Sequence, residues 1–431
     1  MKEVLVSVWC ITYNHKSYIR DALESFLMQE TDFRYEIVVH DDASTDGTAE
    51  IVKEYEEKYP DLIHGIYQTE NQTSKNGADR RWIWSIQSRY CKGKYIAFCE
   101  GDDYWLDIHK LQMQTAYMET NPECVLTVHD AVLVHGGKNE TKAMHPYKYD
   151  SDISADEIIM QYHGILPTAS MIFRKNALDV DFYGIFLKAG LGDYPLQLWM
   201  MTRGNIHYFS RIMSVYRYMH QGSWSIRVVS DFKSMAIHTV QMIHFLGDFD
   251  AYTSGRFQKS IARRTELFRK SMLLDFGRYA SLESFEESCG RYDRETNGLY
   301  HKEFIDMQEL FSRIFQTKAC DLLTDIRRFH QKYRHIYVMG AGKFGALVAE
   351  QMKHVSLDFE GFVISGSVEE GETYLQKPVR ELKDIPYALD ETGIVIGISL
   401  KNSPDVIGNL KEAGIEHYLV SAVLKGFMEF V

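Results

Sequence analysis

Two adjacent carboxylates, Asp102 and Asp103, follow directly after the apolar run 95–99, with Glu100 just before them. The run has the length and composition of a buried parallel strand. Acidic residues at the carboxyl end of such a strand face the crevice in which open α/β sheets bind their ligands. Clustered carboxylate oxygens suit a Mg²⁺ or Mn²⁺ ion that bridges a diphosphate. The same pair also fits a plain acidic turn between a strand and a helix, so the neighbouring segments must decide.

Those segments alternate between strand and helix patterns. Strands are predicted over 4–12, 36–40 and 62–67, and helices from about Ser17, after Ser44 and over 80–90. Ser44 and Thr45 are candidate caps for the second helix. Alternation at this spacing predicts an α/β domain with a parallel sheet. Three of the strands end in polar or acidic residues, which the sheet would gather along one rim: Thr12, Tyr13, Asp42, Asp102 and Asp103.

The motifs at these strand ends resemble family 2 glycosyltransferases of the GT-A fold, over about residues 4–225. The resemblance rests on VWCITYN (8–14), DDASTDG (41–47), GKYIAFCEGDDYW (93–105) and DIHKLQMQ (107–114). It implies a Rossmann-like nucleotide-diphospho-sugar transferase domain at the N-terminus. Ile11 departs from the pattern, because many members of the family have proline or a small polar residue there.

The resemblance also implies roles for single residues. The donor nucleotide would be held by the first strand end, the Asp-Asp-x-Ser motif, a basic residue and the first acid of the central pair: Thr12, Tyr13, Asn14, Asp42, Arg81 and Asp102. The basic residue does not align cleanly, so Arg80 and Arg81 both stay open, with Arg81 taken as the site residue. Asp103 is the implied ligand of a Mn²⁺ or Mg²⁺ cofactor.

Two further residues are candidates nearer the acceptor and the diphosphate. Asp193 stands just before an apolar helix, where a helix cap is the simpler interpretation of the residues alone. The resemblance instead places the catalytic general base at the start of this helix. Residues 216–223 resemble the family's Tyr-Arg-x-x-x-x-Gly-Ser closing loop, in which His220 is a candidate second metal ligand, although a lone histidine is more often structural.

The C-terminal half carries a different pattern. Residues 226–334 are predicted to form a helical connector, and residues 335–431 a small Rossmann-like α/β accessory domain. A short strand leads into Gly340-Ala-Gly342-Lys-Phe-Gly345 and a helix, which is GxGxxG in its usual setting. The next predicted strand ends at Ser365 without the acid expected to hold a ribose, which weighs against NAD binding. A phosphate-bearing ligand at these three glycines and a purely structural role both stay open.

Composition narrows the class of protein. The 431 residues carry a net charge of −12 and a pI near 5.8, which argues against a nucleic-acid partner. No apolar run reaches membrane-spanning length, and no signal peptide is apparent. The six cysteines show no CxxC pairing and mostly lie in apolar runs, so we expect reduced core residues in a cytoplasmic protein. A peripheral position at the membrane and a homo-oligomeric state are left open.

The expected function is inverting, metal-dependent transfer of a sugar from a nucleoside-diphosphate sugar to a hydroxyl group. UDP is the expected nucleotide, and a glycan or lipid-linked acceptor in bacterial surface polysaccharide synthesis is the expected partner. Two alternatives stay open: a bifunctional enzyme whose C-terminal domain binds NAD(P), and a non-catalytic nucleotide-sugar-binding scaffold. The sugar, the acceptor and the linkage depend on the poorly patterned region 130–190.

Overall fold

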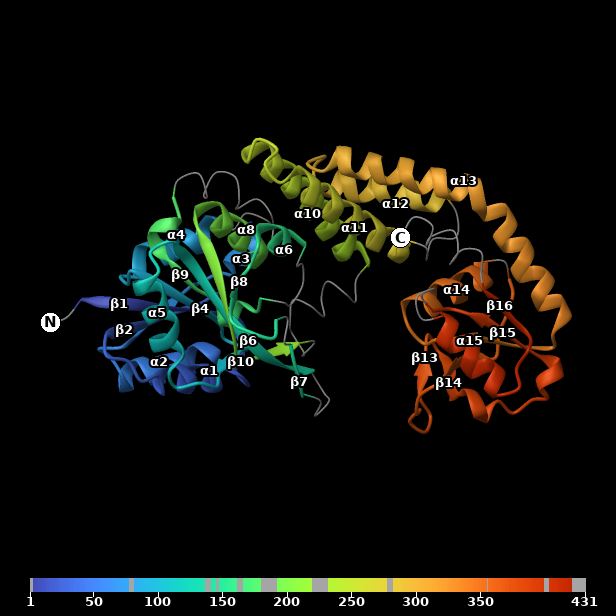
Figure 1. Cartoon of the computed structure of the whole chain (residues 1–431), viewed down its shortest axis with the longest axis horizontal. Helices are drawn as coiled ribbons and strands as arrows, with labels where there is room; N and C mark the ends of the chain where they lie inside the picture. Colours follow the sequence, from blue (N-terminus) through green and yellow to red (C-terminus); the bar gives the residue numbers. More distant parts are fainter. Residues whose placement is uncertain are drawn as a thin grey trace. The chain divides into compact units, whose positions relative to one another are not determined.

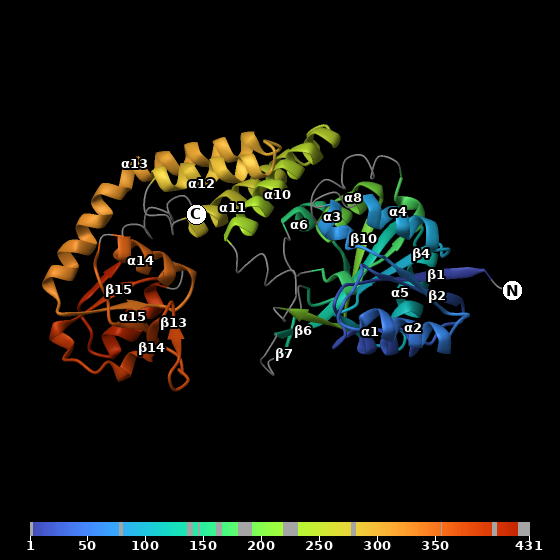
Figure 2. The same cartoon turned by 180° about the vertical axis from the view of Figure 1, so that it is seen from behind.

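The computed structural model describes residues 3–76, 81–135, 141–144, 147–160, 166–179, 192–218, 232–276, 282–354, 356–398 and 403–420. The chain divides into two compact units, Met1–Arg264 and Thr265–Val431 (Figures 1 and 2). The helix α11 (Gln258–Phe276) contains the boundary between them. The division into domains 1–225, 226–334 and 335–431 stays a prediction.

The first unit is built on the parallel strands expected from the sequence. Four strands lie in the order β3-β2-β1-β4, and every neighbouring pair among them is parallel. Their bounds are β1 (Val4–Thr12), β2 (Arg34–Asp41), β3 (Ile63–Tyr67) and β4 (Tyr95–Glu100). The predicted strands start and end within two residues of these bounds, because each is an apolar run that ends on a polar residue.

The sheet then continues as a mixed sheet in the order β4-β9-β6-β10-β5. β9 is antiparallel to β4 and β6, and β5 is antiparallel to β10. The added strands are β5 (Tyr104–Trp105), β6 (Cys124–His135), β7 (Thr141–Ala143), β8 (Ser151–Asp152), β9 (Ile172–Arg174) and β10 (Asn205–Tyr218). Because β5 follows the acidic pair directly and lies on β10, residues 102–105 and 214–217 become neighbours.

Helices cover both faces of this sheet. In Figures 1 and 2, α1 and α2 lie on one side, and α4 and α8 lie on the other. The helices of the unit are α1 (Ile19–Leu27), α2 (Thr48–Lys58), α3 (Gln72–Asn76), α4 (Arg81–Tyr90), α5 (Lys110–Thr120), α6 (Ala155–Met160), α8 (Asp193–Arg203) and α10 (Phe232–Tyr252). Alternate β1 residues Val6, Val8 and Cys10 pack with Leu23 and Phe26 of α1 in one core, as the period of two in a strand requires.

The second unit has its own sheet and core. Its strand order is β13-β14-β12-β11-β15-β16, parallel except for the β13–β14 pair. The strands are β11 (His335–Met339), β12 (Gly361–Ile364), β13 (Thr373–Tyr374), β14 (Lys377–Glu381), β15 (Thr392–Ile396) and β16 (Tyr418–Val420). Its helices include α12 (Leu282–Glu295), α13 (His301–Lys332), α14 (Lys343–His354) and α15 (Ser403–Glu412). Within the described parts of the chain, no helix combines the length and the apolar character needed to cross a membrane.

Candidate active site at the carboxyl ends of β1, β2 and β4

The structure brings the polar strand ends together. In the strand registers, Thr12 lies opposite Asp41, and Ile11 lies opposite Glu100. The backbone N–H of Asp42 donates to the Thr12 carbonyl at 3.0 Å, and that of Gly101 donates to the Ile11 carbonyl at 2.9 Å. As expected from the sequence, these strand ends therefore lie side by side, and the acidic turn lies directly beside the end of β1.

Gly101 permits this close approach. A Cβ atom at this position would lie 2.6 Å from Thr12 Oγ1 and 3.1 Å from His15 Nδ1. The first distance is shorter than real Cβ contacts, so any side chain would push the turn away from β1. The Glu-Gly-Asp-Asp sequence thus combines two acids with the one residue that lets them sit against the strand end.

Asp103 is the most unusual group at the rim. Its side chain is 1% exposed, and Oδ1 accepts a hydrogen bond from the Arg217 backbone N–H at 2.8 Å. Oδ2 is buried and has no hydrogen-bond partner among the residues that the structure describes. Burial raises the pKa of Asp103 well above its usual range, and the charges of Asp102 and Glu100 raise it further. A buried carboxylate oxygen without a partner is costly and is the kind of donor that a hard divalent cation accepts.

Asp102 is held from two sides. Its carboxylate lies 3.7 Å from His15 Nε2, and its backbone carbonyl accepts a hydrogen bond from Arg217 Nη1 at 2.6 Å. His15 was not among the residues expected at the site, although it follows the strand end Tyr13-Asn14 in sequence. That position was the signal that could have identified it.

Asp42 is buried, and both of its carboxylate oxygens accept backbone hydrogen bonds. Oδ1 accepts from the N–H of Gln72 at 2.6 Å, and Oδ2 accepts from that of Thr73 at 3.0 Å. Asn71 Nδ2 also donates to the Asp42 carbonyl at 3.0 Å. Asp42 therefore fixes the start of α3 at the rim, while one lone pair on each oxygen stays available to a further donor.

Asn14 organises the loop after β2. Its backbone has a positive φ of 55°, and its N–H donates to Ser44 Oγ at 2.9 Å. Its Oδ1 accepts from the N–H of Thr45 at 2.9 Å. The expectation that Ser44 or Thr45 caps the second helix is wrong, because α2 begins at Thr48 after Gly47, whose φ of 101° suits only glycine.

The other predicted donor residues differ in how the structure places them. Thr12 is buried, with Oγ1 lacking a hydrogen-bond partner, and Tyr13 is 39% exposed at the rim. Arg81 is the first residue of α4. Arg80 and His220 lie outside the described residues.

Asp193 and the acidic turn share Tyr216 as a neighbour. It is the first residue of α8, after Gly192, rather than the cap that precedes the helix. Burial raises the pKa of the Asp193 carboxyl. Burial also raises the pKa of the Tyr216 hydroxyl, and four surrounding carboxylates raise it further: Asp103, Glu100, Asp193 and Asp102. The Tyr216 hydroxyl therefore lies within electrostatic range of both the acidic turn and Asp193 at the start of α8.

Lys110, at the start of α5, was not expected at the site. Its side chain is fully buried, and Nζ lies 4.3 Å from the centre of the Trp105 ring without a hydrogen-bond partner. Burial lowers the pKa of Lys110 to about 7, and the charge of Cys99 opposes this. Burying this amine therefore costs stability near neutral pH, because the unfolded chain holds the proton more tightly.

We expect Lys110→Met to stabilise the protein near neutral pH. Because the folded state lowers the pKa of this amine from 10.5 to about 7, the unfolded chain binds its proton more tightly. The free energy of unfolding of the wild type should therefore rise with pH between about 7 and 10.5, and the variant should lack this rise. Urea unfolding at several pH values measures it. A variant that keeps the wild-type slope would show that Lys110 is not the group responsible.

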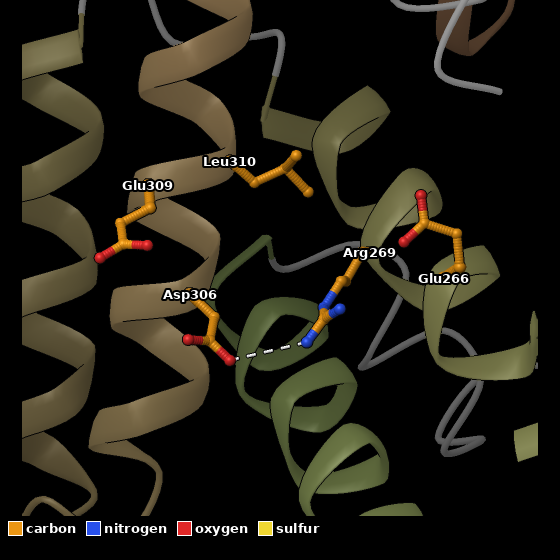
Figure 3. A pocket seen from close by; sticks show the side chains of 5 residues that line it. All are labelled: Glu266, Arg269, Asp306, Glu309 and Leu310. Atoms are coloured by element: carbon orange, nitrogen blue, oxygen red, sulfur yellow. Dashed lines mark ion pairs between the residues drawn. The ribbon is translucent and has the colours of Figure 1, made fainter. Parts of the chain in front are cut away.

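A separate pocket of about 250 Å³ lies in the second unit, between α11 and α13 (Figure 3). It is lined by Glu266, Arg269, Asp306, Glu309 and Leu310. Arg269 pairs with Asp306 at 3.6 Å, and Lys302 lies 3.5 Å from the same carboxylate. None of the residues expected at a site lines this pocket, and we assign no function to it.

The glycine motif of the second unit has two conformational requirements. Gly340 has a φ of 104°, and a Cβ at Gly345 would lie 1.8 Å from the Gly340 carbonyl oxygen. A Cβ at Gly342 would meet no atom within 4 Å. Gly340 and Gly345 are therefore needed to join β11 to α14, whereas packing does not require Gly342. Phosphate binding at these glycines stays a prediction.

Comparison with known proteins finds similarity mainly in the first unit. Residues 7–180 match the family model described as glycosyl transferase family 2. An uncharacterized protein of Mycobacterium bovis is 31% identical over 229 residues, which are 51% of this chain and 60% of the relative. The Escherichia coli UDP-Glc:alpha-D-GlcNAc-diphosphoundecaprenol beta-1,3-glucosyltransferase WfaP is 35% identical over 116 residues, which are 27% of this chain and 42% of the relative. The chain thus spans less than two thirds of either curated relative.

Among solved structures, residues 1–349 of Staphylococcus aureus TarS in complex with UDP are similar at 18% identity and a TM-score of 0.41. The similarity covers 73% of this chain and 92% of that one.

Proposed function

We propose that the protein transfers a sugar from a nucleoside-diphosphate sugar to a hydroxyl acceptor, and the match of residues 7–180 to the glycosyl transferase family 2 model supports this proposal. The observation that carries the proposal is Asp103, a buried carboxylate with one oxygen unpartnered, at the strand end beside Asp102. The proposal that Asp193 takes part is supported by its charge, which raises the pKa of Tyr216 together with the charges of Asp103 and Asp102.

The rim of β1 and β2 would bind the nucleoside. Tyr13 offers an exposed aromatic face on which a base can stack, and Asp42 keeps lone pairs for an N–H donor of a base or a ribose hydroxyl. Thr12, Asn14, Arg81 and Asp102 are the other donor residues that we propose. UDP is the nucleotide that we favour, since the name of the Escherichia coli relative specifies a UDP-linked donor.

Asp103 fits a divalent cation such as Mn²⁺ or Mg²⁺. Its Oδ2 is a buried oxygen without a hydrogen-bond partner, of the kind that these cations prefer. Within the described residues, no group of three or more His, Cys, Asp or Glu side chains is placed to hold a metal ion. We propose that Asp103 would hold the ion, with His220 as a further ligand. When bound, the ion would supply positive charge that stabilises the leaving diphosphate.

Asp193 would act as the general base. Its carboxylate accepts the proton of the acceptor hydroxyl while the hydroxyl oxygen bonds to the anomeric carbon. The bond from that carbon to the diphosphate oxygen breaks, and the oxygen keeps the electron pair. A single displacement of this kind inverts the anomeric configuration. The raised pKa of Asp193 makes it a stronger base than an exposed aspartate.

We propose a glycan or a lipid-linked saccharide as the acceptor, in the synthesis of a bacterial surface polysaccharide. The support is the name of the Escherichia coli relative, which specifies a diphosphoundecaprenol-linked acceptor.

Thermal unfolding in the presence of a panel of nucleotide sugars, with Mn²⁺ or with EDTA, tests the proposal. A ligand that binds only the folded state at 100 times its dissociation constant adds about 2.7 kcal/mol of stability. We expect a uridine-linked sugar with Mn²⁺ to raise the unfolding temperature and EDTA to remove the effect. Stabilisation by NAD(P) without any response to nucleotide sugars would favour the bifunctional alternative. Stabilisation by a sugar donor that the protein never hydrolyses would favour the scaffold.

A further inference from the structure

Arg217, near the end of β10, makes several contacts with the acidic turn. Its backbone N–H donates to Asp103 Oδ1 at 2.8 Å, and its Nη1 donates to the Asp102 carbonyl at 2.6 Å. Its guanidinium carbon lies 5.0 Å from the ring centre of Tyr18 and 4.6 Å from that of Tyr104. The side chain is 15% exposed. Arg217 thus ties β10 to both residues of the acidic pair, more than 100 positions away in sequence.

These contacts decide which atoms of the turn are available. The backbone bond occupies Asp103 Oδ1 and fixes the rotation of the carboxylate, so Oδ2 is the oxygen without a partner. The bond to the Asp102 carbonyl holds the backbone between the two acids. A ligand carboxylate whose orientation is already fixed by hydrogen bonds loses less conformational freedom when the ion binds.

The other end of the guanidinium is occupied by Asp21 of α1. Arg217 Nη2 donates to Asp21 Oδ2, and the Asp21 side chain is 56% exposed. The ion pair therefore sits at the surface on one side and against the acidic turn on the other. Because the bonds to Asp21 and to Asp102 use different nitrogens of one planar group, Asp21 fixes the direction in which Nη1 points.

We propose that Arg217 and Asp21 are a positioning pair for the divalent cation: Asp21 orients the Arg217 guanidinium, and Arg217 holds the Asp102–Asp103 turn so that Asp103 Oδ2 faces the ion. This inference rests on the proposed function. It adds two residues to which we assign no donor contact, and one of them, Asp21, lies on α1 with a largely exposed side chain. Residues that orient metal ligands in this way typically contribute about 10- to 100-fold to metal affinity or activity.

Three variants test the pair, with UDP and Mn²⁺ as probes. Arg217→Met removes both side-chain hydrogen bonds, and we expect about 10- to 100-fold weaker Mn²⁺ binding in the presence of UDP. Arg217→Lys keeps the charge but not the planar fork, so its Mn²⁺ affinity should also fall. Asp21→Asn keeps the shape and removes the charge, and we expect a smaller loss. The signal of free Mn²⁺ in electron paramagnetic resonance gives each affinity, and UDP affinity in EDTA should change little.

The variant that combines Asp21→Asn with Arg217→Met distinguishes a positioning role from a general loss of structure. If Asp21 acts only through Arg217, Asp21→Asn should have no further effect on Mn²⁺ affinity in an Arg217→Met background. Glu54→Gln is the matched control, because Glu54 pairs with Arg20 of the same helix α1 through Nη1 at 3.2 Å and Nη2 at 2.6 Å. We expect this control to bind Mn²⁺ as the wild type does.

The outcomes are distinguishable. Wild-type Mn²⁺ affinity in Arg217→Lys and Asp21→Asn, or additive losses in the double variant, would overturn the positioning pair and leave the proposed function intact. If the wild type itself binds no Mn²⁺ with UDP, the proposed metal site fails, and this inference fails with it. Asp21→Asn keeps the test decisive should Arg217→Met fold poorly, because its side chain is largely exposed.

Discussion

Asp103→Asn should abolish Mn²⁺-dependent binding of UDP and should at the same time stabilise the ligand-free protein. The loss follows because Asp103 Oδ2 is the buried oxygen that we assign to the cation, and a neutral amide is a much weaker ligand. The gain follows because the amide removes a carboxyl whose ionised form the fold disfavours. Each unit by which the pKa is raised corresponds to about 1.4 kcal/mol. Calorimetric titration and thermal unfolding measure the two effects.

The sign of the pH dependence follows from the raised pKa of Asp103. The folded state binds this proton more tightly than the unfolded chain, so protonation stabilises the fold. Relative to Asp103→Asn, the ligand-free wild type should gain stability as pH falls through the raised pKa toward 3.8. Mn²⁺ affinity should fall over the same range, since the ion must displace the proton.

Asp61→Asn, at an exposed position, serves as the charge-matched control for Asp103→Asn. Normal Mn²⁺-dependent UDP binding by Asp103→Asn would remove Asp103 from this role.

Asp193→Asn should lower turnover by about 10²- to 10⁴-fold while UDP and Mn²⁺ affinities stay near those of the wild type. The amide keeps the size of the side chain and an oxygen that can accept hydrogen bonds at the start of α8, but it cannot accept the proton of the acceptor. In the wild type, turnover should rise with pH through the raised pKa of Asp193, because only the carboxylate acts as a base. Steady-state kinetics and donor titrations give both quantities.

A helix-start aspartate elsewhere provides the control. Asp405 is in the first turn of α15 and is exposed, so Asp405→Asn changes a comparable charge without touching the site. Equal turnover in wild type and Asp193→Asn would leave Asp193 with a purely structural position at the start of α8. The base would then have to be another group near the acidic turn.

Much of the first sheet could be predicted from local sequence. β1 and β4 are apolar runs that end on polar residues, and their bounds are visible without any long-range information. The position of Thr12, Asp42 and Asp102 along one rim could also be predicted, because parallel strands place their carboxyl ends together. Both predictions use only the spacing of apolar residues and this rule about parallel strands.

The contacts that complete the site could not be predicted in the same way. Arg217 reaches Asp103 only because β10 lies on β5, and the hydrogen bond between them joins residues 114 positions apart. Asp42 could be named as a rim residue, yet its hydrogen bonds to the start of α3 depend on how the loop after β3 folds back. The start of α2 was missed because Asn14, in the loop that follows β1, binds Ser44. Each case depends on partners that local patterns do not identify.

The most direct test of the account is the proton NMR spectrum of the sugar released when the purified protein hydrolyses the donor selected by thermal unfolding. The account predicts slow, Mn²⁺-dependent release in which water replaces the acceptor. The first anomer to appear, before mutarotation, should have the configuration opposite to that in the donor, and Asp103→Asn should release none. Release of the retained anomer, or release that continues unchanged in EDTA, would contradict a metal-dependent single displacement at this rim.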